Sequence, residues 1–281
     1  MLKVTYFGTT TLLLDDEKDQ VLFDAHVTRP SLRKYVMGEK VSTNAALCDK
    51  LIELHRIDRL RAVFVSHTHH DHVMDAPYIA NKCSAKIYGS ESAKNVALGG
   101  GVPDDHIVIF SHGSCFTIGD YRICVLKSLH SKPNKFNNDL GEPIPAPLKQ
   151  PASLREYKEG GSYDFYVEHG EKRILIRPSF NYIKGQLDGM HADVIFLGVA
   201  GLAKADPEME ETFFAETVEK TGAKLVIPVH WDNFFSPLGQ PIEDMPDLLE
   251  KTDLVFFKVA KYCEAHDVNF LVQYPCTSIV L

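Results

Sequence analysis

Four histidines and one aspartate fall within residues 67–72, in the segment Ser66-His67-Thr68-His69-His70-Asp71-His72. This segment follows residues 61–65, a short apolar run that predicts a buried strand. Burying so many polar groups beside a strand costs several kcal/mol unless a ligand satisfies them. The segment therefore predicts a metal site at a strand end, and the fold must be one that can build such a site.

His67 and His69 are two residues apart, so at an extended strand end their side chains project to the same side and can bind one ion. Asp71 and His72 follow where the chain turns, and they can reach a neighbouring ion. Imidazole suits Zn, Fe, Ni and Cu, while a carboxylate adds charge and a hard oxygen ligand.

Strand patterns and helical patterns alternate along the chain. Strands are predicted at residues 3–7, 11–14, 21–23, 61–65, 85–88, 121–126, 163–167, 174–176, 192–198, 224–229 and 269–273, and helices at 44–55, 74–82, 208–220 and 247–267. Strands followed by helices occur in both halves, with hairpins added. We therefore predict a layered α/β architecture rather than an all-β barrel.

The cluster resembles the H-x-H-x-D-H motif of the metallo-β-lactamase fold superfamily, with its four defined positions filled by His67, His69, Asp71 and His72. Further matches in order and spacing are Asp24, His130, and His230 in Pro228-Val229-His230-Trp231-Asp232. The resemblance covers essentially the whole chain and is to the broad metal-dependent hydrolase branch. It implies an α/β fold, a four-layer αββα sandwich, as a single domain over residues 1–281 with metals at one edge between the sheets.

The resemblance implies that His67, His69 and His130 hold one metal and that Asp71, His72 and His230 hold a second. The nucleophile would be metal-activated water or hydroxide, because a metal lowers the pKa of bound water from ~15.7 toward ~7. The bond cleaved would be an ester, phosphodiester, lactone or amide of a small substrate. We expect one or two divalent ions, zinc first, with Mn, Fe or Ni as alternatives.

The resemblance departs at Ser179, where the family usually has an aspartate that bridges the two metals. A serine hydroxyl is a poorer bridge than a carboxylate, so three outcomes stay open. The site holds one metal and Asp71 acts as a general base; it holds two metals at lower affinity; or Asp232 supplies the missing carboxylate. The other interpretation of Asp232 is a solvated or loop-capping residue.

Other residues near the motif are candidates for supporting roles. Tyr182 and Lys184 can stabilise a developing oxyanion or simply be exposed loop residues, and Trp231 can line the pocket or pack in the core. Asp24 can bind a metal or support a metal ligand from behind, and His26 can support a ligand; the group that orients a ligand imidazole cannot be assigned from the sequence. His70 occupies a variable slot of the motif and is not expected to bind metal.

Residues 131–161 are rich in Pro, Asn, Lys and Gly, and they begin directly after His130. Long irregular stretches within a domain are usually functional loops or disordered segments. We favour the functional alternative and predict that this segment is a loop that shapes the substrate pocket.

The net charge of −8 argues against nucleic-acid binding, so we expect a small-molecule substrate. No apolar run reaches the ~18 residues of a membrane helix, and the N-terminus does not resemble a signal peptide, so we expect no membrane insertion and a cytoplasmic protein. The six scattered cysteines form no C-x-x-C pair and are expected to be reduced and mostly buried. The oligomeric state stays open.

Two alternatives remain within the same fold. A catalytically degenerate metal- or ligand-binding protein is favoured by Ser179 and opposed by the presence of every other candidate ligand. Redox chemistry at a di-iron site is opposed by His69, where that group has a carboxylate, and by the lack of room for a flavin domain.

Overall fold

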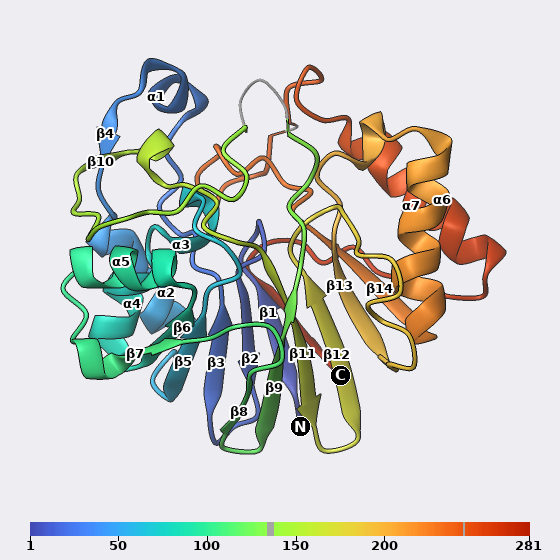
Figure 1. Ribbon diagram of the computed structural model, residues 1–281, viewed down its shortest axis with the longest axis horizontal. Helices are drawn as coiled ribbons and strands as arrows, with labels where there is room; N and C mark the ends of the chain where they lie inside the picture. The colour runs from blue at the N-terminus through green and yellow to red at the C-terminus, as the bar shows by residue number, and fades with distance from the viewer. Residues whose placement is uncertain (134–137, 244) are drawn as a thin grey trace.

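In the computed structural model, which describes residues 1–133, 138–243 and 245–281, two seven-stranded sheets lie face to face (Figure 1). The first sheet has, in spatial order, β16 (Thr277–Val280), β1 (Lys3–Tyr6), β2 (Leu12–Asp15), β3 (Gln20–Phe23), β5 (Leu60–Phe64), β6 (Lys86–Gly89) and β7 (Ile107–Ile109). The second has β15 (Asn269–Phe270), β14 (Leu225–Val229), β13 (Val194–Gly198), β12 (Lys172–Arg177), β11 (Tyr163–His169), β9 (Tyr121–Lys127) and β8 (Cys115–Ile118). A short separate ladder pairs β4 (Lys40–Val41) with β10 (Ala152–Ser153).

Helices cover both outer faces (Figure 1). The first sheet is covered by α2 (Ala45–Leu54), α4 (Ala76–Cys83) and α5 (Glu91–Gly99), and the second by α6 (Pro207–Phe214), its π-helical continuation at Ala215–Glu219, and α7 (Thr252–Ala265). Two shorter helices, α1 (Leu32–Met37) and α3 (His70–Val73), lie above the strand ends. The expected four-layer αββα sandwich is confirmed.

Aromatic packing between the two sheets forms the inner core. Phe23 and Phe64 of the first sheet meet Phe165 of the second, with ring centroids 5.2 and 5.6 Å apart. A second apolar cluster lies between the first sheet and its helices, and includes Val63 and Ile79. The strands of both sheets are therefore fixed from both faces, which gives the strand ends a rigid base.

Two of the helices, α2 and α6, begin directly after residues whose side chains cap the helix N-terminus. The Asn44 side chain accepts a hydrogen bond from the Leu47 N–H at the start of α2, and Asp206 does the same for Met209 at the start of α6. Both satisfy an N–H group that has no partner within its own helix. Pro207 follows Asp206, at a position where a missing N–H has no cost.

The topology brings the chemistry-bearing residues to one edge. Strands β3, β5 and β6 run parallel, as do β12, β13 and β14. Asp24 directly follows β3, His67 comes shortly after β5, and His230 directly follows β14. Because the carboxyl ends of parallel strands lie at the same sheet edge, this edge is where a site can form.

Several elements were not predicted: α1, α5, β7, β8 and β16. The outer strand β16 is largely exposed and lacks the apolar alternation that marks a half-buried strand. In β8 the half-buried Phe116 and Ile118 do alternate with exposed residues, but a strand of four residues is too short for this to be a strong signal. The predicted helix at 247–267 is shorter, because α7 begins only at Thr252. Residues 134–137 of the predicted 131–161 loop lie outside the described residues. No helix in the part of the chain that is described is both long and apolar enough to cross a membrane.

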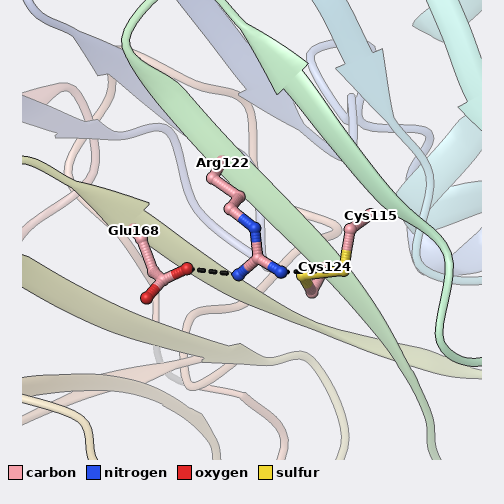
Figure 2. Close-up of a disulfide and its surroundings, with 4 residues drawn as sticks. All are labelled: Cys115, Arg122, Cys124 and Glu168. Atoms are coloured by element: carbon pink, nitrogen blue, oxygen red, sulfur yellow. Dashed lines mark hydrogen bonds and ion pairs between the residues drawn. A yellow bond between two sulfur atoms is a disulfide. The ribbon is translucent and has the colours of Figure 1, made fainter.

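The expectation that all six cysteines are reduced is wrong for one pair. Cys115 and Cys124 form a disulfide between β8 and β9, where they are direct register partners (Figure 2). The sequence did not reveal this pairing because β8 was not predicted, so the hairpin that aligns the two residues was missed. Disulfides are typical of oxidising compartments, and the cytoplasmic location stays a prediction.

Figure 2 shows the Arg122 side chain reaching between the disulfide and Glu168 on the neighbouring strand. Its Nη2 atom lies 3.7 Å from the Cys115 sulfur, and Nη1 pairs with the Glu168 carboxylate. The disulfide and this ion pair tie together β8, β9 and β11.

Candidate metal centre

His67, His69 and His130 form a first triad of candidate ligands. One ring nitrogen from each lies within 4.8 Å of the others. His67 and His69 come from the turn after β5 in the first sheet, whereas His130 follows β9 in the second. The triad therefore joins the two sheets, and its spacing suits three ligands of one ion.

Asp71, His72 and His230 form a second triad with the same spacing limit of 4.8 Å. Oδ2 of Asp71 lies 3.3 Å from Nε2 of His230 and 3.6 Å from Nε2 of His72. Asp71 and His72 lie on the short helix α3, and His230 follows β14 in the second sheet. The structure thus groups the six residues as the sequence motif implied.

The two triads adjoin each other. The ring centroids of His67 and His72, one from each triad, are 3.7 Å apart, and those of His72 and His230 are 5.3 Å apart. The arrangement can hold one ion in either triad or an ion in each.

The protonation state of the first-triad histidine nitrogens suits the binding of a divalent cation. Nε2 of His67 is buried and has no hydrogen-bond partner, and the residue is 2% exposed. Burial, reinforced by neighbouring histidines, holds the pKa of His67 well below its usual range, and burial lowers the pKa of His130 to about 3. Neutral imidazoles with a free lone pair are the form that binds metal. An unsatisfied buried nitrogen is otherwise costly.

Asp71 is held as a carboxylate. Burial acts to raise its pKa, but electrostatic attraction to the nearby His72 ring and the hydrogen bond from His230 outweigh burial, so the pKa lies well below its usual range. The lowered pKa keeps the Asp71 side chain ionised near neutral pH, and its role as a general base stays a prediction. Its chemistry fits a ligand that supplies negative charge.

Asp24 orients His72 through a buried hydrogen-bond network. Its Oδ2 lies 2.7 Å from Nδ1 of His72, and the Ser66 N–H and hydroxyl donate to Asp24 at 2.7 and 2.8 Å. Thr10 Oγ1 donates to the same carboxylate. Because Nδ1 of His72 faces the carboxylate, Nε2 remains free to bind a metal. Asp24 therefore supports a ligand and is not a member of either triad.

The Asp232 carboxylate is fully engaged away from the triads. It pairs with Arg29 at 2.8 Å, accepts from the Tyr6 hydroxyl at 2.8 Å and accepts from the Thr9 N–H at 2.7 Å. The His230 N–H in turn donates to the Thr9 carbonyl at 2.5 Å. Asp232 thus fixes the turn that carries His230, and this agrees with the loop-capping alternative.

The neighbouring turn at residues 7–11, which contains Thr9, depends on Gly8, which has a φ of +94°. A Cβ atom added there would lie 1.9 Å from Arg29 Nη2 and 2.5 Å from Asp232 Oδ2. The position therefore excludes any side chain, both for its conformation and for space.

Ser179 lies two residues beyond the end of β12 and is buried. Its carbonyl accepts a hydrogen bond from the Asn181 N–H at 3.0 Å. The nearby Asn181, which sequence reasoning missed, donates from Nδ2 to the His130 carbonyl at 2.6 Å. Arg177 donates to the Asn181 carbonyl at 2.8 Å, so this segment holds His130 in place.

Two other candidate residues, Trp231 and Tyr182, pack against the core of the protein. Trp231 packs between Tyr6, Phe256 and Tyr274, with ring centroids 6.5, 5.1 and 6.3 Å away, as expected for core packing. Tyr182 is half-buried against the inner core.

Lys184 is exposed and follows Tyr182 on the surface. Catalytic roles for it and for Tyr182 stay predictions.

Aromatic side chains surround the second triad. The Phe234 ring lies edge-on to His230, His70 and His26, with centroids 5.4, 6.5 and 6.4 Å apart. The Tyr35 ring stacks on His70 at 5.7 Å. These contacts give the second triad an apolar boundary, which strengthens electrostatic interactions inside it.

Asp139 is a further residue that the sequence did not reveal. Its Oδ1 lies 3.1 Å from Nε2 of His69, and it belongs to the 131–161 segment. A single acidic residue in an irregular stretch carries no motif, so no pattern in the sequence could have indicated it.

Comparisons with known proteins show which family and fold the chain is similar to. The sequence model of the beta-lactamase superfamily domain matches residues 20–231. A UPF0173 metal-dependent hydrolase of Roseiflexus sp. (strain RS-1) is 25% identical over 217 residues, which cover 77% of this chain and 82% of that protein.

Two solved structures share the fold over their whole length. The metallo-β-lactamase fold protein YhfI from Bacillus subtilis superposes with a TM-score of 0.61 at 14% identity, with 100% of each chain covered. A possible metal-dependent hydrolase from Veillonella parvula gives 0.60 at 16% identity, also with 100% of each covered. The matched sequence model spans most of the chain and contains the histidine motif, so the chain belongs to the metallo-β-lactamase superfamily.

Proposed function

We propose that the chain is a metal-dependent hydrolase of small substrates, acting on an ester, phosphodiester, lactone or amide bond. The observation that carries the proposal is the convergence of six metal-binding side chains from both sheets into two adjoining triads. The UPF0173 metal-dependent hydrolase of Roseiflexus supports the same class of activity.

The first triad (His67, His69 and His130) would hold one divalent ion, and the second (Asp71, His72 and His230) another. Zinc is the first candidate, because imidazole with one carboxylate is a typical zinc ligand set, with Mn, Fe or Ni as alternatives. When bound, such an ion lowers the pKa of water toward neutrality and polarises the bond to be cleaved.

The chain's own residues contribute orientation and charge. Asp24 holds the Nδ1 side of His72, and the Ser66 hydroxyl lies 3.2 Å from Nδ1 of His67, so the Nε2 atoms of both rings face away from these partners. The catalytic contribution proposed for Asp71 is a fixed negative charge within 3.3 Å of His230 Nε2. The aromatic rings of Phe234 and Tyr35 limit water around this triad.

A catalytically degenerate metal-binding protein is the second candidate, and Ser179 is the observation that favours it. Without a bridging carboxylate, the second triad has less negative charge to offset two cations. The two candidates differ in one outcome: both bind metal, but only the hydrolase turns over substrate.

The test is a hydrolysis assay of the zinc- or manganese-loaded protein on chromogenic esters, phosphodiesters, lactones and anilides. The double variant His67→Ala/His69→Ala should lose the activity. The matched control is His191→Ala/His266→Ala, which removes two histidines outside both triads. Activity that survives the first double variant would refute the metal mechanism, while metal binding without turnover on any substrate class would favour the degenerate protein.

A further inference from the structure

One side chain of the 131–161 segment, that of Asp139, contacts a histidine of the first triad. Oδ1 of Asp139 lies 3.1 Å from Nε2 of His69, and the two side chains are only 15% and 13% exposed. The residues are 70 positions apart in sequence. This contact therefore depends on how the segment folds back over the strand ends.

The contact determines which nitrogen of His69 can bind a metal. An ionised carboxylate only accepts hydrogen bonds, so Nε2 of His69 must carry the hydrogen that faces Asp139. A neutral imidazole has one N–H and one lone pair. Nδ1 of His69 is then the atom left to bind the ion in the first triad.

The backbone around Asp139 is fixed by hydrogen bonds. The Glu142 N–H donates to the Asp139 carbonyl at 2.9 Å, and the Gly141 N–H donates to Oε2 of Glu159 at 2.7 Å. The Glu159 carbonyl accepts from the Thr68 N–H at 2.9 Å, and Thr68 lies between His67 and His69 in the chain. Residues 139–142 are thus linked through Glu159 to the same turn that presents the first-triad histidines.

Lys158 does not compete for the oxygen that faces His69. Its Nζ lies 4.0 Å from the other oxygen of Asp139, Oδ2, and 3.0 Å from Oε2 of Glu142. Glu142 is 55% exposed and, among the described residues, contacts no ligand histidine. Asp139 and Glu142 are therefore two carboxylates on one segment that share a lysine, and only Asp139 contacts the metal centre.

We propose that Asp139 is a positioning residue: it fixes the tautomer and orientation of His69, and through this contact the 131–161 segment controls how tightly the first triad holds its ion. The proposal rests on the proposed metal site. Carboxylate–histidine contacts of this kind raise the basicity of the ligand imidazole, and their loss typically weakens metal binding by ~10–100-fold.

The test is a metal-affinity measurement on the full chain. Metal-depleted wild type, Asp139→Asn, Asp139→Ala and Glu142→Gln are titrated with zinc against a chromogenic chelator, and cobalt-loaded samples are compared by visible absorption. Urea unfolding of the metal-free proteins is measured in parallel. Glu142→Gln is the matched control, because it removes a carboxylate from the same segment and the same lysine without touching His69.

We expect both Asp139 variants to bind zinc ~10–100-fold more weakly than wild type, with an altered cobalt spectrum and unchanged metal-free unfolding. Glu142→Gln should match wild type. Zinc affinities of the Asp139 variants equal to wild type, or a loss shared equally by Glu142→Gln, would overturn the proposal. A wild-type protein that binds no zinc would instead overturn the metal site itself, so the two failures are distinguishable.

Discussion

Oδ2 of Asp24 lies 2.7 Å from Nδ1 of His72, and each side chain is 1% exposed. Asp24 follows β3, whereas His72 lies on α3, so this contact joins a strand end to the helix that carries the second triad. In a site this deeply buried, the charge on the carboxylate acts on the imidazole with little screening by solvent.

Replacing Asp24 with Asn removes the charge and keeps the shape. We expect zinc binding at the second triad to weaken by ~10–100-fold, because His72 loses its charged acceptor. Chelator competition measures this affinity. Asp193→Asn is the matched control, since Asp193 also faces a histidine, His191, at 3.3 Å and lies outside both triads. Equal affinities for the two variants would contradict the role of Asp24.

Ser179→Asp places a carboxylate at the position where the sequence resemblance implies a bridging aspartate. The added charge should make a second zinc ion bind at least ~10-fold more tightly. Isothermal titration of the metal-depleted protein resolves the two binding steps. Ser179→Asn controls for size without charge, and an effect as large in Ser179→Asn would argue against a charge-based bridge.

Asp232→Asn tests the buried pair behind His230. Arg29 and Asp232 are 1% and 0% exposed, so the substitution leaves a buried guanidinium without its counter-charge. We expect the free energy of unfolding to fall by ~3–5 kcal/mol. The exposed pair Lys18–Asp120 provides the control, where Asp120→Asn should cost less than ~1 kcal/mol. Urea unfolding compares the two, and similar losses would show that the Arg29 pair is not a buried anchor.

The lowered pKa of Asp16 predicts that the free energy of unfolding depends on pH. Burial acts to raise its pKa, but hydrogen bonds from the backbone N–H groups of Asp19 and Lys18 and from His169 outweigh burial, so its pKa is lowered on folding. A lowered pKa contributes stability above the unfolded-state value of ~3.9, and this contribution is lost as pH falls through the folded-state value.

The difference in unfolding free energy between wild type and Asp16→Asn should therefore be largest near neutral pH. It should shrink as the pH falls below ~4. Urea unfolding at a series of pH values measures it. A difference that stays constant into the acid range would mean that ionisation of Asp16 does not contribute.

The sequence predicted the fold and the candidate site best where residues form a local pattern, such as a ligand motif or a short apolar strand. The four motif positions from His67 to His72 predicted the triads, because neighbouring ligands on one turn leave a local pattern. The layered architecture followed from strands and helices that alternate in both halves, with buried apolar strands such as β5 and β14. The short strand β8 was not predicted, and the disulfide of Cys115 was missed with it.

Residues that act through long-range contacts could not be predicted. Asp139 meets His69 across 70 residues, and Asn181 meets the His130 carbonyl across 51. Their roles depend on the path of irregular segments, which local periodicity does not encode. The sequence also left Asp232 ambiguous, because only the folded chain shows that Arg29 and Tyr6 occupy its carboxylate.

The most direct test of the central claim is the metal content of the purified protein, measured by elemental mass spectrometry without added metal. We predict at least about one transition-metal ion per chain in wild type and in His191→Ala/His266→Ala, and its loss in His67→Ala/His69→Ala. Wild-type protein that holds no metal, even after loading with zinc, or a His67→Ala/His69→Ala variant that keeps the wild-type content, would contradict the account.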